Sequence, residues 1–108
     1  MEKNIEIVRP NGILDRTASS QFNQKISQSL KAGADIVLID FQDVSFIDSS
    51  GLNALVSAIK AVQSEGKDIF CCSPNSQIKI VFDVSGLDKI IELFENREEF
   101  EKKVLSKE

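Results

Sequence analysis

The chain has 108 residues, a formal net charge of −4 at pH 7, and 42% hydrophobic and 28% charged residues. These values are typical of one globular domain and exclude a disordered chain. The sequence has no histidine, tryptophan or tyrosine, which excludes a Ser-His-Asp triad, a Cys-His pair and a His-ligated metal site. Nucleic-acid binding needs a basic surface, so the acidic balance predicts no nucleic-acid partner.

The cysteines and the apolar runs predict the compartment. Cys71 and Cys72 are adjacent, and neighbouring residues on a strand point to opposite faces, so a disulfide between them is disfavoured. We expect two half-buried thiols in a reducing compartment. The longest apolar run, Ile36–Ile39, is far shorter than the about 20 residues of a membrane span. We therefore expect a cytoplasmic protein with no membrane partner.

The first third of the chain predicts a strand followed by a helix. Ile5–Arg9 alternates and is rich in β-branched residues, which indicates a strand. Pro10-Asn11-Gly12 has the chemistry of a turn. The helix begins near Thr17, capped by Thr17 or Ser19, and ends at Gly33. Its apolar stripe has a spacing of four residues and comprises Ala18, Phe22, Ile26 and Leu30.

The middle of the chain predicts a buried strand and a second helix. Ile36–Phe41 is a continuous apolar run, which is typical of a parallel strand covered on both faces. The segment Val44–Leu52 follows, and the helix then runs to Gly66. Its amphipathic spacing is the clearest in the chain and comprises Leu52, Leu55, Val56, Ile59 and Val62.

The last third predicts two strands and two helices. Asp68–Cys72 is a buried-strand candidate, and Pro74-Asn75-Ser76 opens a helix that ends near Gly86. A short last strand is expected over Lys89–Phe94, and a helix over residues 96–106. This alternation predicts a single α/β domain over residues 1–108, with a mostly parallel sheet of four to five strands and about four helices.

The sequence contains some of the residues of three kinds of chemical site. The pair Gly66-Lys67 does not make a phosphate-binding loop, and no dinucleotide fingerprint follows the first strand. A carboxylate pair could form from four aspartates near the strand-to-helix end of the predicted sheet, but acids also concentrate at such positions as turn formers and helix caps. The four are Asp15, Asp40, Asp43 and Asp48.

The segment Asp48–Leu52 is the remaining candidate. Asp48 and Ser49 are good helix-capping types, which places Ser49 at the first helical turn, where free N–H groups and the helix dipole favour an anion. A phosphate on Ser49 would add about −1.5 to −2 charges without unfolding the helix. An ordinary helix cap explains the same spacing equally well. Gly51 is unfavourable within a helix, but lacking a side chain it lets another surface approach closely.

Three segments resemble the anti-sigma-factor antagonists of the STAS domain superfamily. Phe46–Leu52 is similar to their phosphorylation-site motif, with sequence Phe-Ile-Asp-Ser-Ser-Gly-Leu. Gly12–Asp15, with Thr17 shortly after it, resembles the family's segment entering its first helix. Phe82–Ile91 resembles the family's C-terminal helix, Ser-Gly-Leu turn and last strand. The three lie in the family's order and cover nearly the whole chain.

The resemblance implies a phosphorylation-controlled adaptor rather than an enzyme. In the family, the unphosphorylated domain binds an anti-sigma factor that is also a GHKL-type serine kinase, and a sigma factor is thereby freed for transcription. The kinase phosphorylates the domain and weakens the complex, and a PP2C-type phosphatase restores it. ATP and Mg²⁺ belong to the kinase, so no cofactor is expected in this chain.

The resemblance also implies residue roles. Ser49 is the acceptor, and its choice over Ser50 rests on the resemblance alone. Asp48 would orient the hydroxyl or complete an acidic docking surface, Ser50 would help to cap the helix, and Asp15 would bind the partner. Gly51 is expected within the same partner-binding surface.

One departure and two alternatives stay open. The family usually opens with two strands, whereas only Ile5–Arg9 precedes Gly12 here, so a short or missing edge strand is expected, with a monomer or weak homodimer. The first alternative is a non-switching STAS subunit of a larger lipid-transport or stress-sensing assembly, in which Ser49 only caps a helix. The second is a nucleotide binder, which the lack of a glycine-rich loop disfavours.

Overall fold

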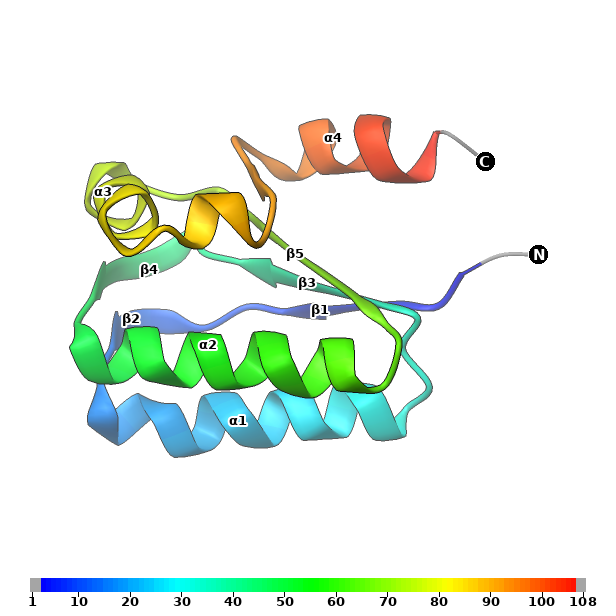
Figure 1. Ribbon diagram of the computed structural model, residues 1–108, viewed down its shortest axis with the longest axis horizontal. Helices are drawn as coiled ribbons and strands as arrows, with labels where there is room; N and C mark the ends of the chain where they lie inside the picture. The colour runs from blue at the N-terminus through cyan, green and yellow to red at the C-terminus, as the bar shows by residue number, and fades with distance from the viewer. Residues whose placement is uncertain (1–2, 107–108) are drawn as a thin grey trace.

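The computed structural model describes residues 3–106 and contains two sheets, each made of parallel strands (Figure 1). The larger sheet has the strand order β1-β3-β5-β6, and β2 pairs with β4 in the smaller one. Every pairing between the described strands is parallel. The strands are β1 (Ile5–Val8), β2 (Asn11–Leu14), β3 (Ile36–Asp40), β4 (Asp43–Ile47), β5 (Asp68–Cys72) and β6 (Leu93–Phe94). The predicted α/β class is therefore confirmed.

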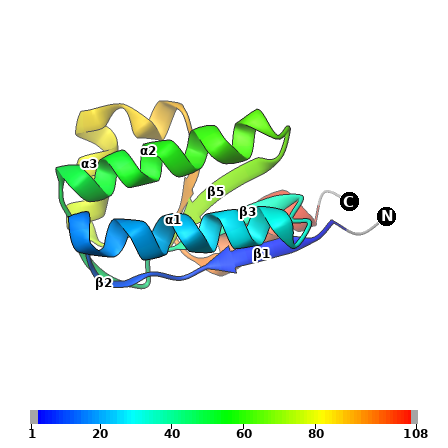
Figure 2. The same ribbon diagram turned by 90° about the horizontal axis from the view of Figure 1, so that it is seen from below.

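Helices cover both faces of the larger sheet (Figures 1 and 2). Helices α1 (Arg16–Lys31) and α2 (Ser49–Ser64) lie side by side on one face. The C-terminal helix, α4 (Arg97–Phe100) with its continuation η2 (Glu101–Leu105), lies on the other. Helix α3 (Ser76–Ser85) packs beside β4. The four predicted helices are present, and the ends of the expected domain, residues 1–2 and 107–108, lie outside the described residues.

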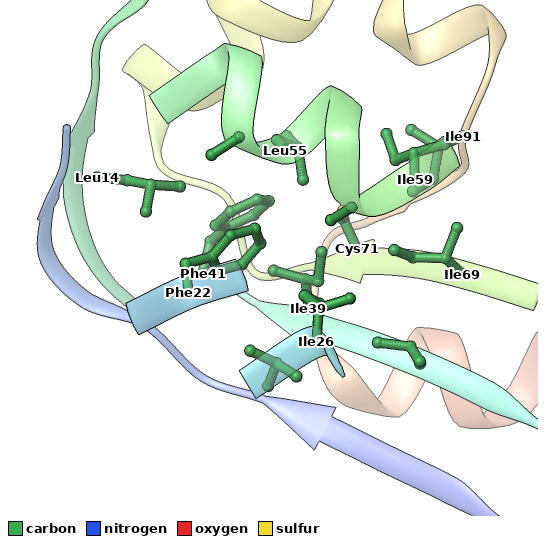
Figure 3. Packing of buried hydrophobic residues seen from close by; sticks show 14 of the residues in the cluster. Leu14, Phe22, Ile26, Ile39, Phe41, Leu55, Ile59, Ile69, Cys71 and Ile91 are labelled. Carbon is green, nitrogen blue, oxygen red and sulfur yellow. The ribbon is translucent and has the colours of Figure 1, made fainter. Parts of the chain in front are cut away.

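The central strand β3 explains the continuous apolar run. All five of its residues are buried, because side chains alternate between two covered faces. Val37 and Ile39 join the larger core beneath α1 and α2, part of which Figure 3 shows. Ile36 and Leu38 join a smaller cluster with Phe94 and Phe100 under the C-terminal helix.

The two cysteines also alternate between faces. Cys71 belongs to the larger core and Cys72 to the smaller cluster. Both thiols are free and fully buried rather than half-buried as expected, because β5 is covered on both faces. Burial in apolar surroundings raises the pKa of each thiol.

We expect the native chain to resist a thiol-specific reagent such as Ellman's reagent at pH 8. Only the thiolate reacts, and both burial and the raised pKa values oppose its formation at Cys71 and Cys72. In guanidinium chloride, the absorbance of the coloured product released by the reagent should correspond to reaction of both of the chain's cysteines. Equal labelling rates with and without denaturant would contradict the observed packing of β5.

Two boundaries predicted for the first third of the chain are wrong. Pro10 separates β1 from β2, but Asn11 already begins β2 rather than completing a turn. Helix α1 is capped by Asp15, whose Oδ1 accepts from the Ala18 N–H at 3.1 Å, and not by Thr17 or Ser19. Aspartate is as good a capping residue as serine, so composition alone did not separate these positions.

The last predicted strand is shorter than Lys89–Phe94. Leu87–Lys89 forms a 3-10 helix, η1, and the Leu87 carbonyl accepts from the N–H groups of Ile90 and Ile91 at 3.0 and 2.9 Å. These N–H groups are used locally, so pairing with β5 begins only at Leu93. At the other end of the chain, β1 has four residues and lies at the edge of the larger sheet. The edge strand is therefore short, as expected, and not missing.

Candidate functional site

The candidate site lies where α1 and α2 begin, at the end of the molecule that carries β2 and β4 (Figures 1 and 2). Strand β2 leads through Asp15 into α1, and β4 leads through Asp48 into α2. Leu14 pairs with Ile47 at the ends of the two parallel strands, so the residues that follow them are neighbours. The fold therefore brings together Asp15 and the segment Asp48–Gly51.

Asp48 is the N-cap of α2. Its Oδ1 accepts a hydrogen bond from the Gly51 N–H at 2.9 Å, and its carbonyl accepts from the Leu52 N–H at 2.8 Å. Its own N–H donates to the Leu14 carbonyl of β2 at 3.3 Å. Asp48 therefore caps α2 through its carboxylate oxygen. Ser50 was expected to help with this capping.

Ser49 is the first residue of α2, and its side chain is exposed. Ser50 is partly buried. The hydroxyl of Ser49 is therefore the more accessible of the two to an approaching kinase. The N–H groups of a first helical turn and the helix dipole favour negative charge, so a phosphate here is compatible with the folded helix.

Gly51 holds α2 against β2. A Cβ atom at this position would lie 1.9 Å from the Leu14 carbonyl oxygen, 2.7 Å from its carbon and 3.0 Å from Cγ1 of Ile47. The close approach predicted at this buried glycine is real, but the surface that approaches belongs to the chain's own β2. Because Gly51 has no side chain, the start of α2 can pack closely against β2. This packing sets the position of Ser49 relative to Asp15.

The other two candidate aspartates have separate local partners. Asp40 is buried, with Oδ2 3.6 Å from an Arg97 nitrogen and Oδ1 accepting from the Gln42 N–H at 2.9 Å. Asp43 forms an exposed ion pair with Arg9 at 3.1 Å. These contacts support the interpretation of the acids as structural residues.

Residues 3–106 contain neither a metal-binding cluster nor a helix able to cross a membrane. That part of the chain contains no group of three cysteine, aspartate or glutamate side chains placed to hold a metal ion. None of the helices described there combines the length and apolarity required to cross a bilayer.

Two residues that hold the site in place were missed from the sequence. The Gln77 side chain accepts from the Ile47 N–H at 3.0 Å and donates to the Ile47 carbonyl at 2.9 Å. Asn75, the N-cap of α3, also donates through Nδ2 to the carbonyls of Val44 and Ser45. These contacts satisfy the outer edge of β4. They span about thirty residues, and a local sequence pattern carries no signal for them.

We expect Asp48→Ala to lower the free energy of unfolding by about 1 kcal/mol, because the Gly51 N–H loses its side-chain acceptor. Urea denaturation followed by circular dichroism measures the change. Asp48→Asn keeps an acceptor at the same place and should lose less. Equal stability of wild type and Asp48→Ala would show that the cap contributes nothing.

Comparisons with known proteins place these features in a family. The model of the STAS domain matches residues 2–100. An anti-sigma F factor antagonist of Paenibacillus polymyxa is 25% identical over 95 residues, which cover 87% of this chain and 81% of that protein.

Two solved structures have the same fold. A crystal structure from Thermotoga maritima, assigned to the anti-sigma factor antagonists, has a TM-score of 0.84 and 26% identity, covering 93% of this chain and 86% of that one. The Bacillus cell fate determinant SpoIIAA in its phosphorylated form has a TM-score of 0.70 and 24% identity, covering 94% and 92%. Since the family model spans nearly all of the described residues and the capped Asp-Ser-Ser-Gly segment lies within it, the chain belongs to the STAS domain family.

Proposed function

We propose that this chain is an anti-sigma factor antagonist controlled by phosphorylation of Ser49. The exposed hydroxyl of Ser49 in the first turn of α2, beside the capping residues Asp15 and Asp48, carries the proposal. The names of the Paenibacillus and Thermotoga relatives support it. In the unphosphorylated state the chain binds an anti-sigma factor and frees a sigma factor for transcription.

The partners proposed are those that the family resemblance implies. We assign the phosphorylation of Ser49 to an anti-sigma factor that is a GHKL-type serine kinase. That kinase binds ATP and Mg²⁺, and a PP2C-type phosphatase removes the phosphate. This chain itself catalyses no reaction and acts in the cytoplasm.

Phosphorylation changes binding without changing the fold. The phosphate adds about −1.5 to −2 charges beside the Asp48 carboxylate, which brings like-charge repulsion and a cost of desolvation when a partner covers it. A loss of about 3 kcal/mol weakens binding by roughly two orders of magnitude. The N-terminus of α2 tolerates the same charge, so the helix persists.

Phosphate mapping tests the acceptor. Each GHKL-type serine kinase of the organism that encodes the chain is purified and incubated with the chain and Mg-ATP, and the product is digested for mass spectrometry. We expect one kinase, the cognate kinase, to add a single phosphate to Ser49. Ser49→Ala should block labelling, whereas the matched control Ser50→Ala should be labelled.

Two results would contradict the proposal. Phosphate on another residue would show that the acceptor is wrong. A chain that no kinase phosphorylates, although every kinase modifies a control substrate, would favour the non-switching subunit. The role of Ser49 would then be limited to the first turn of α2.

A further inference from the structure

Two large apolar side chains are exposed to solvent beside Ser49. Ile13 of β2 is 53% exposed and Phe46 of β4 is 45% exposed. They are paired in register across the smaller sheet. Each precedes a helix-capping aspartate by two residues, so this apolar pair borders the candidate site.

A β-bulge turns Phe46 outward. Gly12 pairs with Val44 and the next residue, Ile13, pairs with Phe46, so Ser45 is an extra residue in β4. Val44 is buried, and strict alternation would bury Phe46, two residues later, on the same face. The bulge reverses the alternation and brings Phe46 beside Ile13 in solvent.

The bulge is held by hydrogen bonds rather than by a loose strand. Asn75 Nδ2 donates to the Ser45 carbonyl at 3.0 Å and to the Val44 carbonyl at 3.3 Å. Gln77 binds both backbone groups of Ile47, and the Ser45 hydroxyl donates to the Gly12 carbonyl at 3.3 Å. The backbone is therefore fixed on both sides of Phe46. A large aromatic side chain kept in water by such contacts indicates an interaction surface.

We infer that the apolar pair Ile13–Phe46 is the hydrophobic anchor through which the chain binds its anti-sigma factor. This inference rests on the proposed function. The pair is continuous with the proposed interface, because β2 leads directly from Ile13 to Asp15 and β4 from Phe46 to Ser49. A buried apolar centre with a polar rim is the usual arrangement of a protein interface.

The charges beside the pair define the partner's chemistry. The carboxylates of Asp15 and Asp48 each use Oδ1 to cap a helix, which places two acidic side chains at the rim. The partner surface that fits is an apolar side chain flanked by lysine or arginine. A phosphate on Ser49 would have to be desolvated at the edge of this apolar contact, which makes its effect on binding larger than on an open surface.

Alanine substitution of the pair tests the inference. The affinity of the cognate kinase in its ADP-bound form is measured by calorimetry for the wild type and for the double variant Ile13→Ala/Phe46→Ala. We expect at least about tenfold weaker binding, the usual effect of losing a central apolar anchor. Ile80→Ala/Val84→Ala is the matched control, since Ile80 and Val84 are 62% and 81% exposed on α3, and it should bind as wild type.

A second variant tests the inference in case the double alanine variant does not fold. Ile13→Thr keeps a β-branched residue suited to a strand while adding a hydroxyl to the contact, and it should also weaken binding. Thermal melts identify any variant that does not fold.

The possible results separate this inference from the proposed function. If folded variants of the apolar pair bind as wild type while Ser49→Asp binds about 100-fold more weakly, the anchor is overturned and the function stands. If none of these substitutions changes affinity, both fall. If sedimentation shows a wild-type dimer that the double variant dissociates, with unchanged affinity for the kinase, a second copy occupies the pair and the anchor is again overturned.

Discussion

Ser49→Asp is expected to bind the cognate anti-sigma factor about 100-fold more weakly than the wild type, which corresponds to roughly 3 kcal/mol. The new carboxylate lies at the exposed start of α2, next to Asp48. A partner whose lysine or arginine already pairs with Asp15 or Asp48 must desolvate this second negative charge without a further cation. Calorimetric titration of the purified kinase measures the change.

Two controls isolate the position of the charge. Ser57→Asp adds the same charge to an exposed serine further along α2, and it should retain wild-type affinity. Ser49→Ala should also bind as wild type, because it removes the hydroxyl without adding charge. Since an acidic residue in the first turn of a helix is stabilising, Ser49→Asp should melt no lower than wild type. Wild-type affinity in a folded Ser49→Asp variant would argue against an electrostatic switch at this residue.

Gly51→Ala should lower the free energy of unfolding by about 3 kcal/mol and the melting temperature by roughly 10–20 °C. The added Cβ would lie 1.9 Å from the Leu14 carbonyl oxygen. That atom belongs to backbone paired in the smaller sheet, so α2 and β2 have to separate. Differential scanning calorimetry measures the loss.

The sign of this effect is itself a test. Alanine is a better helix former than glycine by about 1 kcal/mol, so helix propensity alone predicts that Gly51→Ala stabilises the chain. Asn53→Ala, at an exposed position of the same helix, is the matched control and should change stability little. A Gly51→Ala variant as stable as wild type would show that β2 moves aside at no cost.

Local patterns predicted the elements whose signals are local. The run Ile36–Phe41 identified the central strand because both of its faces are covered, and Gly33, Gly66 and Gly86 marked helix ends because each adopts a left-handed conformation. The capping chemistry of Asp48 placed Ser49 at a helix start because a cap involves only the next three residues.

Features that depend on distant contacts were not predicted. Strand β2 has four residues, and only Leu14 among them is buried, so it showed no hydrophobic periodicity. The bulge at Ser45 hid the exposure of Phe46, since an aromatic residue in strict alternation would be buried. Local patterns offered Asp15, Asp40, Asp43 and Asp48 together and did not single out Asp15 with Asp48, because that pair depends on a parallel pairing of strands far apart in the sequence.

The most direct test of the phosphorylation switch is to measure the affinity of the cognate kinase for the chain before and after stoichiometric phosphorylation. The modified chain is purified, its phosphate is mapped to Ser49, and both forms are titrated under the same ADP conditions. Roughly 100-fold weaker binding of the phosphorylated form, with unchanged circular dichroism, is the expected result. Equal affinities of the two folded forms would contradict a switch based on this hydroxyl.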